Sequence, residues 1–482
     1  MAPVATVNLE APFSLAKLSE DKPAMTVNRR NFLSLAGGAA FHAAGQSFPE
    51  SPIQLMTDSA QAAPANCCGL SVNVRAAPYS ARGDGRTNDT AAITAAVRAV
   101  AAAGGGVVDF PAGIYLVDSI HIPRIRGGTI RFVGQGWSYD AGANTRLVSA
   151  SASPMWVPDG GANGLELSLV HLDGNKLGTY GWYGQAGNKA RLLNVLVDGF
   201  TKCGVYFNQG LCELRQSYVR FNPGIGVRAS SDGWISGTEI GSNGGVGLLV
   251  AGGGNRISDN LINSNGGHGI HITGQYASNQ INSVIGGYLG ENVGQNIMIE
   301  GKSPQNRNVG YTSVIGCFIQ QVGPKRAGGI GVRSARQIQL LGINFLGGAN
   351  DTGCIWMESC DSSQIVGVAS SYSSGNVVRL SACDDVSVAN VTSRDNASER
   401  TSTDDSYAIR IDRGCHRCSI TDVRVTDARA EARARGVKNL GTGTVVLGAY
   451  SFTGVRNPDS FGDAAVMTYD VQAGHWRTSA TG

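Results

Sequence analysis

Two histidines lie three residues apart in the segment "GGHGIHI", at positions 268 and 271. Histidine changes its charge near neutral pH, so such a pair could supply a general base or a metal ligand. The alternation of glycine and isoleucine around them is also typical of a tight turn followed by a short β-strand. We interpret His268 as a turn residue. His271 is the candidate base, because a strand would point its side chain outward.

Glu300 and Glu358 occupy equivalent places in "NIMIEG" and "CIWMES", two repeats apart. Two strand spacings would separate their backbones by about 9.6 Å, and an inverting glycosidase holds its two carboxylates roughly 6.5 to 9.5 Å apart. Glu300 and Glu358 are therefore a candidate acid–base pair. However, Arg333 comes from the repeat between them. Glu, Arg and Glu on three adjacent strands are equally typical of an ordinary ladder of alternating charges on a β-sheet surface. We favour the ladder.

Arginine and tryptophan recur on the same predicted face, as Arg228, Arg333, Trp356 and Arg379. The guanidinium fork matches a uronate carboxylate, and an indole ring can stack on a sugar. These four residues predict a groove for an acidic or mixed polysaccharide. A lyase would use the face differently from a hydrolase, because an arginine would neutralise the uronate carboxylate while His271 or an arginine removes a proton.

A repeat places these side chains. Strand-like segments recur every 21 to 33 residues, and a unit with three short strands cannot bury its apolar side alone, so the units must stack into an all-β parallel β-helix. Asn222, Asn243 and Asn265 share one position and predict a buried amide ladder. Cys360, Cys383 and Cys415 share another, where either disulfides or buried thiols would fit. The predicted inward residues are Val205, Val227, Leu248, Ile270, Ile297, Ile330, Ile355, Val378 and Ile409.

Residues 81–117, "ARGDGRTNDTAAITAAVRAVAAAGGGVVDFPAGIYLV", resemble the opening of the pectate-lyase-superfamily proteins, in the rhamnogalacturonase- and epimerase-like group. The resemblance implies a right-handed parallel β-helix whose open end is capped by a helix at about 90–103. The polygalacturonase-like members carry paired aspartates, then Gly-His-Gly, then Arg-x-Lys. Here Gly267-His268-Gly269 matches, but Asp384-Asp385 comes after it and no Arg-x-Lys follows, which argues against a polygalacturonase.

The N-terminal segment "VNRRNFLSLAGGAAFHAAG" resembles a twin-arginine export signal, with Arg29 and Arg30 before a short apolar stretch. We assign residues 1–62 to the signal region, and residues 1–24 to an over-long start ahead of Met25. The expected partner during export is the twin-arginine translocase, and the expected location is periplasmic or extracellular. The β-helix domain is predicted over 63–444. Residues 445–482, which break the coil pattern, are assigned to a C-terminal cap or tail that could mediate a homo-oligomer.

The composition excludes some partners. The formal net charge is only +3 over 482 residues, and no basic run is interleaved with aromatic residues, so nucleic acid is not expected. No cofactor is predicted, and a calcium site at Asp404 and Asp405 lacks any supporting ligand spacing. The leading hypothesis is an exported lyase or glycoside hydrolase that acts on a uronate-containing or mixed polysaccharide. The competing hypothesis is a non-catalytic β-helix that binds surface polysaccharide or serves a structural role in the envelope.

Overall fold

A computed structural model provides the structure of the chain. It describes residues 69–479 except for 126, 139–143, 186–188, 209, 277, 321–327, 348–352, 397–405, 430–434, 454–458, 461–464 and 471–474. The predicted signal region with Arg29 and Arg30 lies outside the described residues, and so do Asp404 and Asp405. Within the described part, no helix is both long enough and apolar enough to cross a membrane.

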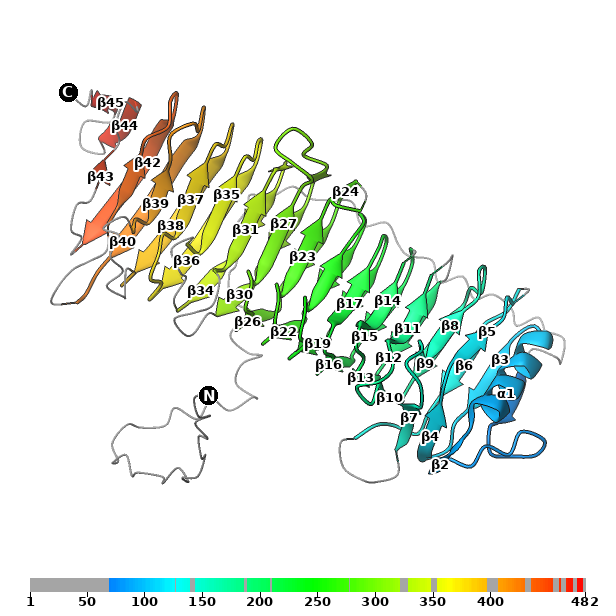
Figure 1. Ribbon diagram of the computed structural model, residues 1–482. Helices are drawn as coiled ribbons and strands as arrows, with labels where there is room; N and C mark the ends of the chain where they lie inside the picture. Colours follow the sequence, from blue (N-terminus) through cyan, green and yellow to red (C-terminus); the bar gives the residue numbers. More distant parts are fainter. Residues whose placement is uncertain are drawn as a thin grey trace, which may run out of the picture. The chain divides into compact units, whose positions relative to one another are not determined.

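Parallel strands form three ladders that run along the stack (Figure 1), and most coils before β36 contribute one strand to each ladder. Ladder 1 consists of β1 (Leu70–Asn73), β3 (Gly106–Asp109), β6 (Ile130–Val133), β9 (Leu165–Ser168), β12 (Ala190–Leu193), β15 (Glu213–Arg215), β18 (Trp234–Ser236), β21 (Arg256–Ser258), β25 (Ser283–Ile285), β29 (Ser313–Ile315), β33 (Gln339–Leu341), β36 (Gln364–Ser371), β38 (Ser387–Arg394), β40 (Ser419–Thr426), β42 (Val445–Thr453) and β44 (Ala465–Asp470). Ladder 2 consists of β2 (Asp84–Asn88), β4 (Gly113–Val117), β7 (Thr145–Ser149), β10 (His171–Asp173), β13 (Leu196–Asp198), β16 (Tyr218–Arg220), β19 (Glu239–Gly241), β22 (Leu261–Asn263), β26 (Tyr288–Gly290), β30 (Phe318–Gln320) and β34 (Asn344–Leu346), and it merges with ladder 1 in the long strand β36.

Ladder 3 carries the predicted face. It consists of β5 (Ile120–Ile122), β8 (Trp156–Pro158), β11 (Tyr180–Gly184), β14 (Cys203–Phe207), β17 (Ile225–Ala229), β20 (Leu248–Val250), β23 (Ile270–Thr273), β27 (Ile297–Glu300), β31 (Ile330–Arg333), β35 (Ile355–Glu358), β37 (Val378–Ser381), β39 (Ile409–Ile411), β41 (Val437–Asn439) and β43 (Asp459–Ser460). Short strands at one corner, β24 (Asn279–Gln280), β28 (Val309–Gly310) and β32 (Ala335–Arg336), form a small third sheet.

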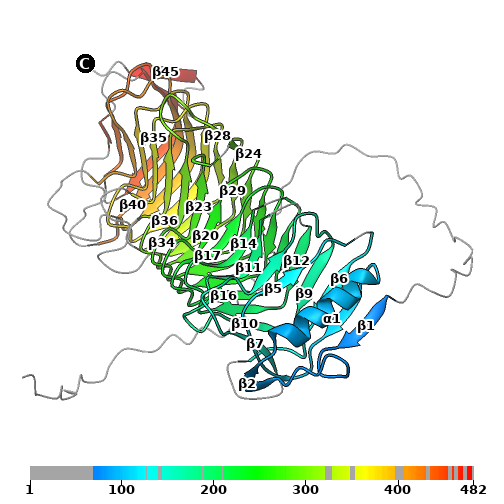
Figure 2. The ribbon, with the colours of Figure 1, turned by 45° about the vertical axis from the view of Figure 1, so that its right-hand side comes forward.

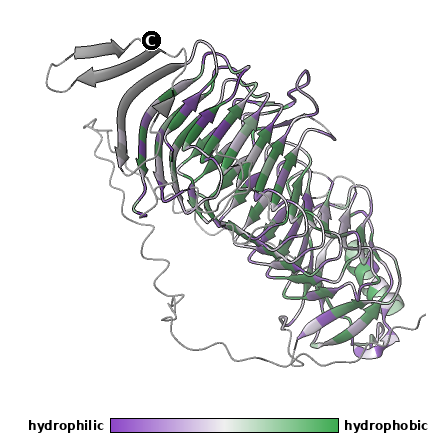
Figure 3. Ribbon diagram, turned by 60° about the vertical axis from the view of Figure 1, so that its left-hand side comes forward, coloured by the Kyte–Doolittle hydropathy of each residue, from purple (hydrophilic) through white to green (hydrophobic). Residues whose placement is uncertain are grey.

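The predicted all-β parallel solenoid and its register are confirmed. Val205 pairs with Val227, Val227 with Leu248, and the pairing continues through every predicted inward residue to Ile409. All of these side chains are buried in one continuous core. Figure 3 shows the hydrophobic positions recurring in the same places of successive coils. The period of two along each strand is therefore sufficient to set which side chains face inward.

A helix, α1 (Thr90–Ala102), covers the end of the stack where the first strands lie (Figure 2). It buries Ile93, Ala96, Val97 and Val100 and contacts β1, β3 and β5. The glycine run after it ends the helix, because Gly104 and Gly105 have φ values of 84° and 134°, which only glycine adopts easily. The predicted capping helix thus shields apolar core that the first coil would otherwise expose to water.

Buried polar ladders stabilise the turns between strands. Asn243 accepts a hydrogen bond from Asn222 Nδ2 at 2.9 Å and donates one to Asn265 Oδ1 at 3.0 Å, which confirms the predicted amide ladder. The stacked cysteines are thiols, since all eight described cysteines are free and buried. Cys383 donates its backbone N–H to Cys415 Sγ at 3.4 Å, and its own pKa is raised to about 12, chiefly by its hydrogen bond with the Cys360 thiol.

The parallel ladder continues beyond residue 445, where the sequence predicted that the coil pattern breaks. Strand β42 pairs in parallel with β40, and β43 pairs in parallel with β41. A register shift between Thr421 and Val423 interrupts the pairing of β40 with β42, and such an irregularity hides the regular alternation from sequence inspection. The stack ends in an antiparallel pair, β44 with β45 (His475–Ser479).

Candidate functional site

The front face is defined here as the outward side chains of ladder 3 from Tyr206 to Lys438. Two columns of side chains make it up, one residue and three residues beyond each inward apolar residue. The first column runs Tyr206, Arg228, Leu249, His271, Met298, Gly331, Trp356, Arg379, Arg410 and Lys438. In the second column, Thr273, Glu300, Arg333, Glu358 and Ser381 are paired in register.

Tyrosine rings surround Arg228 at the N-terminal end of the front face. The Arg228 guanidinium lies 4.7 Å from the ring centres of both Tyr206 and Tyr276, and it donates a hydrogen bond to the Tyr206 hydroxyl. Tyr180 and Tyr183 stack beside Tyr206, with 4.3 Å between their own ring centres. Burial raises the pKa of Tyr206. Arg228 is therefore held between rings, and the fork pairing with a carboxylate that the sequence predicted would require Tyr206 or Tyr276 to move.

The middle of the front face is closed to solvent. Leu249, Thr273 and Met298 occupy outward positions of their strands, where a side chain is expected to face water, but they are only 6%, 1% and 4% exposed. Their strand register is as predicted, so the difference does not come from the strand pairing. Tyr276, in the insertion after β23, places its ring 4.7 Å from the Arg228 guanidinium, which belongs to a strand two coils earlier. The front face consequently has two accessible ends rather than one continuous groove.

His271 lies against Glu300 at the start of the C-terminal end. Its Nε2 atom is 3.4 Å from Glu300 Oε2, yet this atom is buried and outside hydrogen-bond geometry with any described residue. Burial lowers the pKa of His271, while the nearby Glu300 carboxylate opposes this effect. Burial also lowers the pKa of His268 to about 4, and its Nδ1 accepts the backbone N–H of Gln295 at 2.9 Å. Both imidazoles are therefore neutral at physiological pH, and His268 has the structural role at the turn that the sequence predicted.

Arg333 bridges the two glutamates. Its Nε donates to Glu358 Oε2 at 2.9 Å, and its Nη1 lies 3.5 Å from Glu300 Oε1. The same guanidinium lies 5.2 Å from the Trp356 ring centre. A guanidinium thus occupies the space between the carboxylates, where an inverting hydrolase would need a water molecule. This is the arrangement of the charge ladder, and catalysis by Glu300 and Glu358 stays a prediction.

A pocket of about 200 Å³ opens beside this ladder. Its walls include four of the predicted residues, Arg333, Trp356, Glu358 and Arg379. Asp412 accepts hydrogen bonds from Arg379 Nε at 2.8 Å and from Arg410 Nε at 2.6 Å. The structure therefore brings together the predicted residues from His271 to Arg379, while Arg228 lies apart at the other end of the front face.

Several residues of this region were missed by the sequence analysis. Lys438 extends the first column because β41 adds a further coil, and Val437 falls 28 residues after Ile409, within the range of the repeat. Arg410 and Asp412, in "AIRIDR", fall in the outward columns that the sequence predicts, but they were not chosen as binding residues. Tyr276 lies in an insertion, so no periodicity could have placed its ring over Arg228.

A second polar cluster lies on ladder 2. His171, Asp173 and Asp198 each offer a ligand atom, and these atoms lie within 4.8 Å of one another. However, Arg146 Nε donates to Asp173 at 3.0 Å, and His171 Nε2 is 3.0 Å from Asp198 Oδ1. A metal ion would have to displace the Arg146 guanidinium from Asp173. The cluster fits a cation poorly and is accounted for as a set of ion pairs.

Two family models match parts of the chain. The model described as rhamnogalacturonase A/epimerase, pectate lyase-like, matches residues 71–146, and the model of the right-handed β-helix region matches residues 160–307. No curated protein matches the chain in sequence.

Solved structures of three kinds are similar. The A-module of a mannuronan C-5 epimerase from Azotobacter vinelandii has 18% identity and a TM-score of 0.46, covering 82% of this chain and 99% of that one. The catalytic unit of an α-1,3-glucanase from Streptomyces thermodiastaticus has 13% identity and a TM-score of 0.45, and the match covers 86% of this chain and 72% of the glucanase chain. Tailspike protein 3 of bacteriophage CBA120 has 11% identity and a TM-score of 0.47, and the match covers 85% of this chain and 67% of the tailspike chain. Together with the stacked parallel ladders, the family models identify the fold as a right-handed parallel β-helix.

Proposed function

We propose that this protein acts on an anionic, uronate-containing polysaccharide that binds along the C-terminal end of the front face. The observation that carries the proposal is the in-register column Trp356, Arg379, Arg410 and Lys438, which begins at the 200 Å³ pocket. Successive side chains of this column stand about 4.8 Å apart. Such a column offers an aromatic surface followed by three cations to a linear chain of acidic sugars.

Charge favours an anionic ligand. Asp412 is shared by Arg379 and Arg410, so two cations face one carboxylate. Lys438 adds a further positive charge in the next coil. Arginine binds a carboxylate through two parallel hydrogen bonds, which gives direction as well as attraction. The family model that matches residues 71–146 is named for a rhamnogalacturonase, an epimerase and a pectate lyase, which agrees with a polysaccharide as the partner.

Proton abstraction suits this site better than hydrolysis. Burial keeps His271 neutral and thus able to accept a proton, while Arg333 fills the gap that a hydrolytic water would need. Because His271 Nε2 is buried against Glu300, a lyase step requires the imidazole to turn toward the substrate. His271 would then take the proton from C5 of the uronate, the C4–O bond would break, and the electron pair would form the C4=C5 double bond. The leaving oxygen takes a proton from water. Arg333 would neutralise the uronate carboxylate and so stabilise the charge that develops on it.

Non-catalytic binding is the second candidate, and the ion pairs favour it. Glu300, Glu358 and Asp412 already neutralise the arginines of the pocket, as they would on a stable binding surface. The two candidates differ in whether a polymer is changed or only retained.

Incubation of the full chain with uronate-containing and neutral polysaccharides, followed by mass spectrometry of the products, tests both. We expect oligomers that lack one water relative to hydrolysis products. Retention on an immobilised uronate polymer without any product supports the binding candidate. Arg379→Ala should weaken either activity, whereas Arg256→Ala, which removes an exposed arginine of ladder 1, should not. Hydrated oligomers would contradict the lyase step, and the absence of both turnover and retention would contradict the whole proposal.

Export by the twin-arginine route to the periplasm or the exterior is part of the proposal. It rests on Arg29 and Arg30 and the short apolar stretch after them. Replacement of both arginines by lysine should retain the protein in the cytoplasm, which cell fractionation would show.

A further inference from the structure

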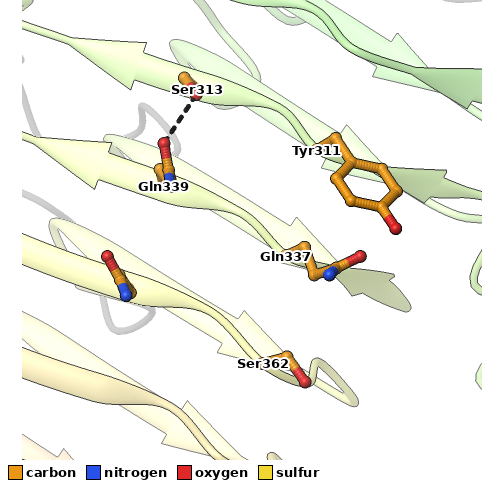
Figure 4. A pocket seen from close by; sticks show the side chains of 6 residues that line it. Tyr311, Ser313, Gln337, Gln339 and Ser362 are labelled. Carbon is orange, nitrogen blue, oxygen red and sulfur yellow. Dashed lines mark hydrogen bonds between the residues drawn. The ribbon is translucent and has the colours of Figure 1, made fainter.

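A second hollow lies on ladder 1, around a corner from the front face. It has a volume of about 320 Å³ and is lined by Tyr311, Ser313, Gln337, Gln339, Ser362 and Gln364. Figure 4 shows these side chains arising from successive coils and flanking one open groove. Ser313, Gln339 and Gln364 are paired in register on β29, β33 and β36, and Ser313 Oγ donates to Gln339 Oε1 at 3.1 Å.

The lining is uncharged. Three carboxamides, two hydroxyls and one phenol make up the groove, and a carboxamide both donates and accepts hydrogen bonds. Sugar hydroxyl groups do the same, so amides and hydroxyls match a neutral sugar in both roles. In the next two coils, Asp385 and Arg417 neutralise each other through two hydrogen bonds of 2.8 and 2.9 Å. The groove lining therefore offers no free charge with which an acidic or a basic ligand could pair.

Tyr311 presents an exposed aromatic ring to the groove. It follows Gly310 at the turn before β29, as Gln337 follows Arg336 and Ser362 follows Asp361 in the next coils. Its φ is +50°, and the equivalent turns of the adjacent coils have the same left-handed conformation, with φ of +61° at Ile281 and +54° at Gln337. Tyr311 is 49% exposed, so its ring does not pack into the core. An aromatic ring that a turn does not need and the core does not bury is available to a ligand.

We propose that this groove binds a neutral polysaccharide, a polymer of uncharged hexose or pentose units, with the Tyr311 ring against a sugar face and Gln337, Gln339 and Gln364 bonding to its hydroxyls. The site is independent of the anionic site of the front face. The protein would then hold two different polymers, or the neutral and acidic stretches of one mixed polymer, on two of its faces. Failure of one site leaves the other unaffected, so the two proposals can be judged separately.

Calorimetric titration of the full chain with neutral hexasaccharides of glucose, xylose and mannose tests this inference. We expect at least one to bind, and Tyr311→Asn to weaken that binding by about tenfold or more. Asparagine tolerates the left-handed turn, so this variant should unfold at the same temperature as the parent or a higher one. Tyr372→Asn is the matched control, because Tyr372 is 50% exposed and has a φ of +60° at a different turn.

Salt separates the two sites. Binding of the neutral hexasaccharide should not change between about 0.05 and 0.5 M NaCl, because no charge takes part, whereas binding of a uronate oligomer to the front face should weaken. Gln339→Ala should weaken the first and spare the second. The inference is overturned if no neutral hexasaccharide binds, or if Tyr311→Asn and Gln339→Ala bind it as the parent does. It is also overturned if Tyr311→Asn only alters sedimentation, since the groove would then be a contact between copies of the chain.

Discussion

Replacing Glu358 by glutamine distinguishes a charge ladder from a catalytic pair. Glu358 Oε2 lies 2.9 Å from Arg333 Nε, and the two side chains are 46% and 47% exposed. Ion pairs at such exposure contribute about 0.2 to 1 kcal/mol, so we expect the free energy of unfolding in urea to fall by less than about 1 kcal/mol. If the ladder is right, turnover of a uronate oligomer should change by less than about fivefold. Loss of a general acid or base would lower it about 10²- to 10⁴-fold.

The same substitution predicts a gain in binding. Without the Glu358 carboxylate, Arg333 is freer to pair with a carboxylate of the ligand. Affinity for a uronate oligomer should therefore rise about two- to fivefold at low ionic strength, and the gain should disappear at high salt. Asp385→Asn is the matched control, because Asp385 forms a comparably exposed pair with Arg417 and neither residue lines the 200 Å³ pocket. Calorimetric titration at two salt concentrations measures both effects.

A hundredfold loss of turnover in Glu358→Gln, with stability and affinity unchanged, would refute this reasoning. The carboxylate pair would then be catalytic, and Arg333 would have to leave the space between Glu300 and Glu358 when substrate binds.

Three further outcomes follow from the buried groups. Asn243→Ala should lower the free energy of unfolding by about 2 to 4 kcal/mol. The Asn243 side chain is buried and forms hydrogen bonds with Asn222, Asn265 and the Val219 carbonyl. The control Asn306→Ala, in an exposed loop, should change the free energy of unfolding by less than about 0.5 kcal/mol. The pKa of His268 is about 4 in the folded chain and about 6.5 when unfolded, so stability is fully present above pH 6.5 and falls as the pH drops toward 4, by about 1 to 3 kcal/mol. Urea midpoints against pH should show this fall and a flatter profile in His268→Gln. The Cys383 thiol, with its pKa raised to about 12, should resist iodoacetamide at pH 8 until the chain is unfolded, and rapid labelling of the native protein would contradict the buried, protonated thiol.

The sequence was sufficient for the fold and for the register of the front face. Each coil must place apolar residues at a strand period of two, and glycine and asparagine must mark the turns, so aligning the segments fixed which residues are neighbours across coils. His271, Glu300, Arg333 and Glu358 were brought together by this alignment alone. Periodicity carries this information because the core enforces it on every coil.

Insertions and end effects could not be predicted in the same way. The Tyr276 ring reaches Arg228 from an insertion whose path depends on tertiary contacts, and the burial of Leu249 and Met298 does not follow from their outward positions on the strands. Lys438 was missed because the predicted series of strands ended at Ile409, although the interval of 28 residues to Val437 lies within the range of the repeat. The Tyr311 groove was missed because its residues are neutral, and neutral polar residues on an outward strand look like ordinary solvated surface.

A β-helix places equivalent residues about 4.8 Å apart, where two like unit charges repel by about 1 kcal/mol even in water. The front face meets this constraint by alternating Glu300, Arg333 and Glu358 and by sharing Asp412 between two arginines. The carboxylates of the protein therefore already occupy positions that the carboxylates of a polymer would take. Under the proposed function, binding of a uronate chain would be an exchange of one set of carboxylates for another. Such an exchange would limit the affinity and would favour a polymer whose charges match the spacing of the coils. The Tyr311 groove avoids the same repulsion by carrying no charge, and so it selects for hydroxyl groups and ring faces instead.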